Sequence, residues 1–262
     1  LFSLVLEGMV TTQAVAGDYV HQVNTLIGTK GTGLTSGYLY PGATYPYGMV
    51  QFTPSYFSKR SGFVINQLSG GGCEHMGNFP TFPVKGKLKM SPDNILNYRI
   101  NVSEEKGHAG YYEAMVQEDI KAKLTVTERT GMASYEYPAD QQYGTIIIGG
   151  GISATPIEQA AIVITAPNKC EGYAEGGNFC GLRTPYKVYF VAEFDTDAFE
   201  TGTWKREELM PNTTFAEGEY SGVYFTFDVN KKKNIQYKIG VSYVSVENAR
   251  ENLKAENAEW DF

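Results

Sequence analysis

The sequence predicts an all-β protein: one large antiparallel β-sandwich with a short C-terminal linker helix. Three observations predict this class. Apolar and polar residues alternate with a period of two in several segments, turn residues separate those segments, and almost no helical period lies between them. Strands at this spacing favour two antiparallel sheets packed face to face.

The alternation is clearest in four segments. In residues 120–127, apolar side chains at every second position alternate with lysine and threonine. The same pattern recurs in residues 188–194, 223–229 and 235–243. Each segment is expected to form a strand with one face in a core and the other toward water or a second layer.

Turn residues mark the ends of these strands. Pro-Ala-Asp at 138–140, Ala-Pro-Asn at 166–168 and Glu-Gly-Glu at 217–219 are such signals. The basic run at 231–233 lies between two predicted strands and is expected to be a solvated hairpin tip. A chain of 262 residues suffices for one large all-β domain or two small ones.

One helix is predicted, at the C-terminus. Ser245 is a candidate N-cap, and Glu247 in the first turn suits the positive end of the helix dipole. Residues Val246, Ala249, Leu253 and Trp260 fall near one stripe. Two large aromatic residues close the chain, which predicts that the helix is a linker cut from a longer protein.

Composition excludes some classes of partner. The net charge of −7 argues against nucleic acid, because phosphate binding needs clustered lysine and arginine. No segment approaches about 18 uninterrupted apolar residues, so no membrane span is expected. Residues 1–17 resemble the second half of a secretory signal peptide with an Ala-Val-Ala site at 14–16, which predicts export. The alternative interpretation of residues 1–17 is a disordered lead.

Three cysteines do not make a disulfide framework. Cys170 and Cys180 flank a glycine-rich stretch, and an oxidising compartment would allow them to pair and leave Cys73 free. No Cys-x-x-Cys pattern occurs, and Cys73-Glu74-His75 is too closely spaced for a tetrahedral zinc site.

The densest functional signal lies in residues 63–83. This segment holds three consecutive glycines, a cysteine, a histidine, an Asn-Gln pair and several phenylalanines. It suits a loop whose backbone closely approaches another group, and loops carry function more often than the elements they connect. His21 and His108 sit in isolated polar settings and are expected to be exposed or hydrogen-bonded within the protein, whereas His75 lies near Cys73, Glu74 and further amide residues and is the candidate for ligand contact.

Other motifs have simpler interpretations. The glycines at 28–33 are in the wrong order for a phosphate loop and indicate a flexible surface loop. Ser69 lacks the Gly-x-Ser-x-Gly context of a nucleophile and is expected to bond the backbone. No pair among the 29 acidic residues is singled out by spacing or setting, so no catalytic residue is assigned.

Several segments, in the same order along the chain, resemble the N-terminal domain of glycoside hydrolase family 92, the calcium-dependent exo-acting α-mannosidases. The resemblance runs from about Asp18 to the end. It rests on the segments 23–29 (VNTLIGT), 40–51 (YPGATYPYGMVQ), 63–72, 110–112, 124–129 (LTVTER) and 241–246 (VSYVSV).

The resemblance implies a two-domain enzyme of which this chain is the first part. By this resemblance, residues 18–245 would be the β-sandwich, of the supersandwich type, and residues 246–262 would begin a helical linker to an (α/α)₆ barrel that is absent here. The family's general acid, general base and most calcium ligands lie in that barrel. The fragment alone is therefore expected to be inactive, with no metal site or cofactor of its own and calcium only in the full-length enzyme.

The resemblance also places the glycine-rich loop at the sugar pocket between the two domains. Neutral groups bind sugar hydroxyls and flat apolar surfaces bind pyranose faces. The expected substrate-binding residues are Phe63, Asn66, Gln67, Ser69, Gly70, Gly71, His75 and Asn78, with Phe63 or Phe79 offering the flat surface. Where many members carry Ser-His-Thr-His, this chain has Val-Ile-Asn-Gln at 64–67, so its linkage preference is open.

Two functions remain open at this point. The first is an accessory domain of a secreted or periplasmic bacterial α-mannosidase that acts on mannose-containing glycans. The second is a stand-alone, lectin-like carbohydrate-binding module.

Overall fold

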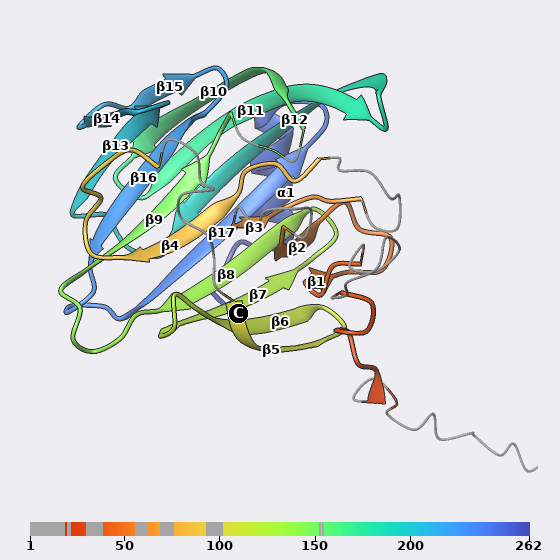
Figure 1. Ribbon diagram of the computed structural model, residues 1–262, viewed down its shortest axis with the longest axis horizontal. Helices are drawn as coiled ribbons and strands as arrows, with labels where there is room; N and C mark the ends of the chain where they lie inside the picture. Colours follow the sequence, from red (N-terminus) through yellow and green to blue (C-terminus); the bar gives the residue numbers. More distant parts are fainter. Residues whose placement is uncertain are drawn as a thin grey trace, which may run out of the picture.

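The computed structural model describes residues 19, 22–29, 39–55, 62–68, 76–92, 102–151, 153 and 155–262. The described residues form two large antiparallel sheets that pack face to face, with one helix near the C-terminus (Figure 1). The prediction of an all-β sandwich is therefore confirmed. The predicted lead at 1–17 lies outside the described residues.

The first sheet has eight strands in the order β1-β2-β3-β4-β9-β16-β13-β14. They are β1 (Ala43–Thr44), β2 (Gln51–Pro54), β3 (Phe63–Val64), β4 (Thr81–Lys85), β9 (Tyr143–Gly149), β16 (Ser221–Asp228), β13 (Glu200–Lys205) and β14 (Glu208–Pro211). The short strands β3 and β4 flank the glycine-rich loop, so this sheet positions the two ends of the loop.

The second sheet has nine strands in the order β15-β10-β11-β12-β17-β8-β7-β6-β5. They are β15 (Phe215–Glu217), β10 (Ile157–Ala166), β11 (Lys169–Phe179), β12 (Leu182–Phe194), β17 (Asn234–Ser242), β8 (Thr130–Glu136), β7 (Ile120–Val126), β6 (Tyr111–Val116) and β5 (Val102–His108). All four segments with period-two alternation are strands, which confirms that part of the prediction.

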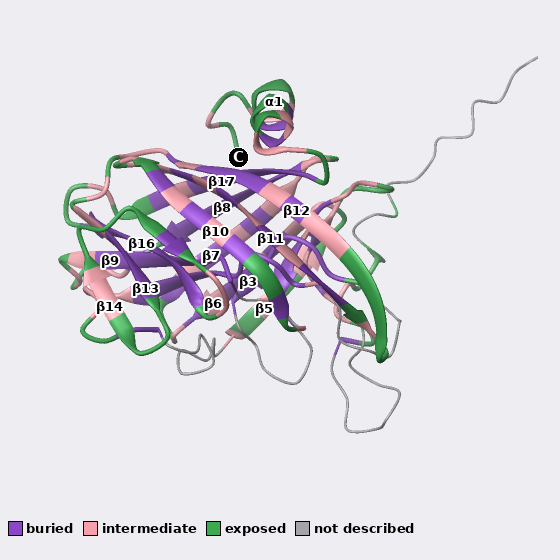
Figure 2. Ribbon diagram, turned by 90° about the horizontal axis from the view of Figure 1, so that it is seen from above, coloured by how far each residue is buried: buried purple, intermediate pink, exposed green. Residues whose placement is uncertain are grey.

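The C-terminal helix α1 (Val246–Glu256) lies on the outer face of the nine-stranded sheet (Figure 2). Ser245 caps it as predicted, because its hydroxyl accepts a 3.1 Å hydrogen bond from the Asn248 N–H. Ala249 and Leu253 pack against Val191 of β12. The helix ends at Glu256, so Trp260 is not part of its apolar stripe as the sequence had predicted. Among the described residues, no helix has the length and apolar character needed to cross a membrane.

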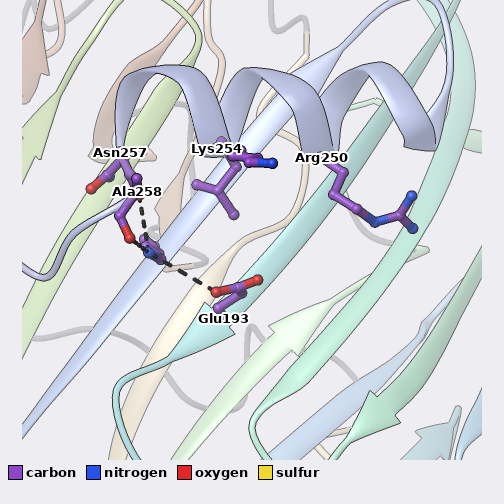
Figure 3. Close-up of a pocket in the computed structure, with 7 residues that line it drawn as sticks. Glu193, Arg250, Lys254, Asn257 and Ala258 are labelled. Carbon is purple, nitrogen blue, oxygen red and sulfur yellow. Dashed lines mark hydrogen bonds and ion pairs between the residues drawn. The ribbon is translucent and has the colours of Figure 1, made fainter.

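The chain beyond α1 is held to the sheet by Lys238 of β17. The Lys238 ammonium donates to the carbonyls of Asn257 (3.0 Å) and Ala258 (2.8 Å) and lies 4.4 Å from the centre of the Trp260 ring. A cavity of about 220 Å³ lies here, and Figure 3 shows Glu193 below the last turn of the helix. Burial lowers the pKa of Lys238. Because its ammonium already bonds two carbonyls, we interpret this cavity as part of the helix attachment.

Glu256, the last residue of α1, fixes the helix to the β7–β8 turn. Its carboxylate accepts hydrogen bonds from the Thr127 hydroxyl (2.6 Å), the Arg129 backbone N–H (2.9 Å) and the Arg129 guanidinium. A carboxylate at a helix C-terminus opposes the helix dipole, so these donors are what hold it there. Burial acts to raise the pKa of Glu256, but the hydrogen bonds from Thr127 and Arg129 outweigh it and hold that pKa below the ordinary 4.5.

This carboxylate predicts an acid-sensitive attachment of the helix. A pKa lowered by folding contributes stability that is present above the ordinary value of 4.5 and is lost as the pH falls through the folded-state pKa. Glu256→Gln is expected to lower stability near neutral pH and to flatten the loss of stability on acidification. Urea unfolding at a series of pH values measures both effects. Glu251→Gln, an exposed change on the same helix, should leave the pH profile as in the wild type.

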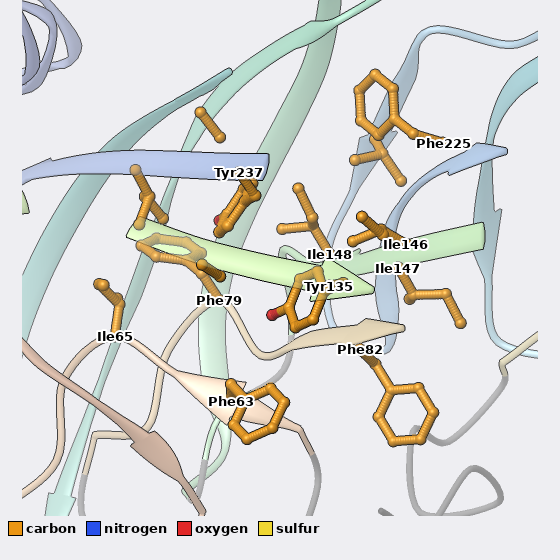
Figure 4. Close-up of a cluster of buried hydrophobic side chains, with 14 of the residues drawn as sticks. Phe63, Ile65, Phe79, Phe82, Tyr135, Ile146, Ile147, Ile148, Phe225 and Tyr237 are labelled. Atoms are coloured by element: carbon orange, nitrogen blue, oxygen red, sulfur yellow. The ribbon is translucent and has the colours of Figure 1, made fainter. Parts of the chain in front are cut away.

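The core lies between the two sheets (Figure 4). Phe194 of β12 contacts Phe225 of β16 with ring centroids 4.7 Å apart, which joins the two layers. Phe63 packs against Tyr135, with centroids 6.1 Å apart. Burial of each such side chain contributes roughly 1.5–3 kcal/mol, so the core firmly positions β3 and with it the start of the glycine-rich loop.

Candidate functional site

The two ends of the glycine-rich loop lie side by side. Gln67 and Met76 form an isolated antiparallel bridge, and the Gly77 N–H donates to the Asn66 carbonyl over 2.7 Å. The residues between them, 69–75, lie outside the described residues, and they include the predicted site residues Ser69, Gly70, Gly71 and His75. The described part of the candidate site is therefore the base of this loop, formed by residues 63–68 and 76–80.

Asn66 organises the base of the loop. It is 2% exposed, and its side-chain oxygen accepts hydrogen bonds from the backbone N–H groups of Gly77 (3.2 Å) and Asn78 (2.8 Å). Its amide nitrogen donates to the hydroxyl of Tyr243 over 3.2 Å. Both ends of the Asn66 side chain are thus occupied within the protein, which gives it a positioning role.

Asn78 is fully buried, and only one of its two side-chain polar atoms is hydrogen-bonded. Its side-chain oxygen accepts a 2.9 Å hydrogen bond from the hydroxyl of Tyr186 on β12. Its amide nitrogen has no hydrogen-bond partner. Burial raises the pKa of Tyr186 to about 12, so this phenol stays neutral and donates its proton. The side chain of Asn78 therefore keeps one free N–H₂ donor.

Gln67 has the least satisfied side chain of the site. The residue is 3% exposed, yet neither its side-chain oxygen nor its side-chain nitrogen has a hydrogen-bond partner. Only its backbone N–H is paired, with the side-chain oxygen of Gln51 at 3.3 Å. A buried polar group without a partner costs about 1–3 kcal/mol, and such groups are rare in folded proteins. The Gln67 side chain thus offers a hydrogen-bond donor and an acceptor that no described residue of the protein uses.

The phenylalanines of the segment contribute to the core instead of offering a surface. Phe63 is fully buried between Tyr135 and Tyr112, and Phe79 packs on Phe190 with ring centroids 4.2 Å apart. Neither ring is accessible to a sugar in this structure, so the flat surface expected from them must come from elsewhere.

Residues far away in the sequence complete the site. Tyr243 is 38% exposed and bonds Asn66, and Tyr186 bonds Asn78. Gln51 connects Gln67 to the turn at Gly48. Its side-chain oxygen accepts the Gln67 backbone N–H, and its amide nitrogen donates to the Gly48 carbonyl at 3.3 Å. The sequence analysis did not assign any of these three residues to the site. Gln51 and Tyr243 do lie in the segments that resemble family 92, and that was the available signal.

The cysteines do not pair as the sequence analysis considered. Cys170 is a free, buried thiol on the core side of β11, and burial raises its pKa. Cys180 is disulfide-bonded, so Cys170 is not its partner. Cys73 lies outside the described residues. Along β11 the buried Cys170 stands between two partly exposed residues, Lys169 and Glu171, which directs its side chain into the sandwich.

The fold and the site define a large antiparallel β-sandwich domain that carries buried, neutral hydrogen-bonding groups at one end. The chain belongs to glycosyl hydrolase family 92, because residues 22–242 match the model of the family's N-terminal domain. The resemblance stated from the sequence is therefore confirmed.

Related proteins are longer than this chain. An uncharacterized secreted glycosidase of Arthroderma benhamiae is 24% identical over 302 residues, which cover 99% of this chain and 38% of that protein. An inverting family 92 mannosidase of Bacteroides thetaiotaomicron superposes with a TM-score of 0.79 at 24% identity, over 93% of this chain and 34% of that one. A family 92 α-mannosidase of the same organism superposes with a TM-score of 0.77 at 24% identity, over 92% of this chain and 36% of that one. These similarities establish the fold, and the chain spans little more than a third of each relative.

Proposed function

We propose that this chain is the N-terminal domain of a secreted α-mannosidase and that the base of its glycine-rich loop forms one side of the sugar pocket. The observation that carries the proposal is the buried side chain of Gln67, whose donor and acceptor are both unpaired. Family membership and the secreted glycosidase relative support the glycosidase class. The mannosidases of the same fold support mannose as the sugar.

Neutral amides suit sugar hydroxyls, because each hydroxyl both donates and accepts a hydrogen bond. The Gln67 side chain can likewise both donate and accept a hydrogen bond, and the amide nitrogen of Asn78 adds a further donor. No ionised group is needed for such recognition. The proposed division of roles is that Gln67 and Asn78 contact the sugar, and Asn66, Tyr186 and Tyr243 position them.

We propose that the reacting groups are supplied by a further domain of the longer protein. Inverting hydrolysis needs two carboxyl groups roughly 6.5–9.5 Å apart, one that protonates the leaving oxygen and one that activates water. The calcium that the resemblance implies would need a cluster of oxygen ligands. Among the described residues no group of three or more acidic, histidine or cysteine side chains could hold a metal ion, so we assign no step to calcium here.

Binding measurements on two forms of the protein test this division. We expect calorimetric titration with methyl α-mannoside to show binding to the full-length protein. The chain 18–262 alone should bind at least about a hundredfold more weakly, because it offers only two of the side chains that contact the sugar. Equal affinity in the two forms would instead identify a stand-alone carbohydrate-binding module. A full-length protein without binding or mannosidase activity would refute the proposal.

A further inference from the structure

A second cleft lies at the far end of the β11–β12 hairpin. It has a volume of about 270 Å³ and is lined by Pro156, Glu158, Gly177, Asn178, Gly181 and Arg183. We propose that this cleft binds one sugar unit of a longer glycan, as a subsite separate from the Gln67 side chain. The identity of that sugar as mannose rests on the proposed function, whereas the cleft itself rests on the contacts below.

Backbone geometry keeps the floor of the cleft free of side chains. Gly177 has a φ of 141°, and a Cβ atom there would lie 2.0 Å from the Thr184 carbonyl oxygen. The β11–β12 register shifts between Gly176 and Asn178. At the hairpin tip, Cys180 (φ 52°) and Gly181 (φ 82°) both have positive φ, as in a two-residue type I′ turn. The close approach of the Thr184 backbone explains the glycine at position 177, whereas an added Cβ atom at Gly181 would meet nothing within 4 Å, so the space beside the hairpin tip is open to a ligand.

Charged and amide side chains line the rim of the cleft. The Arg183 guanidinium on β12 donates to both oxygens of Glu158 on β10, at 3.2 Å and 2.9 Å, and so reaches across β11 where the glycines lie. The side-chain oxygen of Asn178 accepts the Gly181 N–H at 3.1 Å, which fixes the orientation of this amide. The Arg183–Glu158 pair is exposed and hence adds little stability, so it is free to exchange its partners for those of a ligand.

The chemistry of the rim selects the class of ligand. A metal cation is disfavoured by the Arg183 guanidinium, and a simple anion is disfavoured by the Glu158 carboxylate. An apolar ligand finds only Pro156 to pack against. A neutral ligand with several hydroxyl groups satisfies all the polar groups, because hydroxyls donate to Glu158 and accept from Arg183. The volume is just below the usual range for pockets of drug-sized ligands, about 300–1,000 Å³, and suits a single sugar ring.

The position of the cleft connects it to the first site. Tyr186, whose hydroxyl bonds Asn78, lies three positions from Arg183 on the same strand. On this proposal, a glycan of several sugars contacts both places, whereas a single sugar contacts only one. Preference for longer glycans is the functional consequence.

Titrations of the protein with two ligands test this inference. We expect α-linked mannotriose to bind more tightly than methyl α-mannoside. Arg183→Ala and the double variant Arg183→Ala/Glu158→Gln should weaken mannotriose binding by about tenfold, because hydrogen bonds from a charged group are lost, and leave methyl α-mannoside unaffected. Arg206→Ala, which removes another exposed arginine paired with a glutamate, is the matched control and should change neither affinity.

The outcomes separate the two proposals. Unchanged mannotriose affinity in both Arg183 variants, or equal wild-type affinity for the two ligands, overturns the second subsite. Tighter binding of trialanine than of mannotriose, with the same dependence on Arg183, would assign the cleft to a peptide and also overturn it. A Gln67→Met variant that binds both mannosides normally counts against the first site alone. If maltotriose binds in an Arg183-dependent way and mannotriose does not, the cleft is still a sugar subsite, but its sugar is not mannose.

Discussion

Gln67→Met is expected to stabilise the protein and at the same time to weaken its activity on mannosides. Methionine has nearly the volume of glutamine but no polar amide, so it fills the same buried space without unpaired groups. Because the Gln67 amide has no partner in the protein, its removal should raise the free energy of unfolding by about 1–3 kcal/mol. On the proposed function, the loss of the Gln67 hydrogen bonds to the sugar should lower kcat/KM of the full-length protein for mannosides about ten- to a hundredfold.

Two measurements check this prediction. Urea unfolding of wild type and variant gives the change in stability, and initial rates on an aryl α-mannoside give kcat/KM. Gln159→Met, a change at an exposed glutamine of β10, is the control and should leave both quantities within error. A destabilised Gln67→Met protein would mean that the amide already has a partner in the folded chain. Full activity in a stabilised variant would mean that Gln67 is not a sugar contact.

Much of the fold could be predicted from the sequence because half-buried strands leave a period of two. β7 and β11 show this pattern directly. β8 is buried on both faces, so both faces carry apolar or small residues and its sequence does not show a clear period of two. The order of the strands within each sheet could not be predicted from local sequence patterns either. β9 lies between β4 and β16, which are far apart along the chain, and such pairings depend on long-range packing.

The sequence singled out the segment at 63–83 but not the contacts that hold it. The amides Asn66, Gln67 and Asn78 do lie together, because local sequence brings the two ends of one loop into contact. Phe63 was expected at the sugar and lies in the core, since an aromatic residue in a loop looks the same in sequence whether it packs or binds. Tyr243 lies 177 positions from the amide that it contacts, so no local pattern could connect them.

The structure further separates two adjacent amides that the sequence treats alike. Asn66 and Gln67 are both buried, but Asn66 has its polar atoms paired and Gln67 does not. The same polar-to-apolar change should therefore have opposite effects on stability at the two positions. This contrast does not depend on any ligand, so it tests the description of the site by itself.

Asn66→Leu is accordingly expected to destabilise the protein by about 2–3 kcal/mol. The buried Asn78 N–H loses its acceptor and the Tyr243 hydroxyl loses its donor, whereas the Gly77 N–H keeps the Asn66 backbone carbonyl. Urea unfolding measures the loss, and hydrogen exchange of the Asn78 amide should become faster than that of amides in β9. Tyr243→Phe, which removes only the hydroxyl, should cost less, about 0.5–1.5 kcal/mol. If Asn66→Leu and Gln67→Met change stability in the same direction, then the two amides do not differ in the way that their hydrogen bonds indicate.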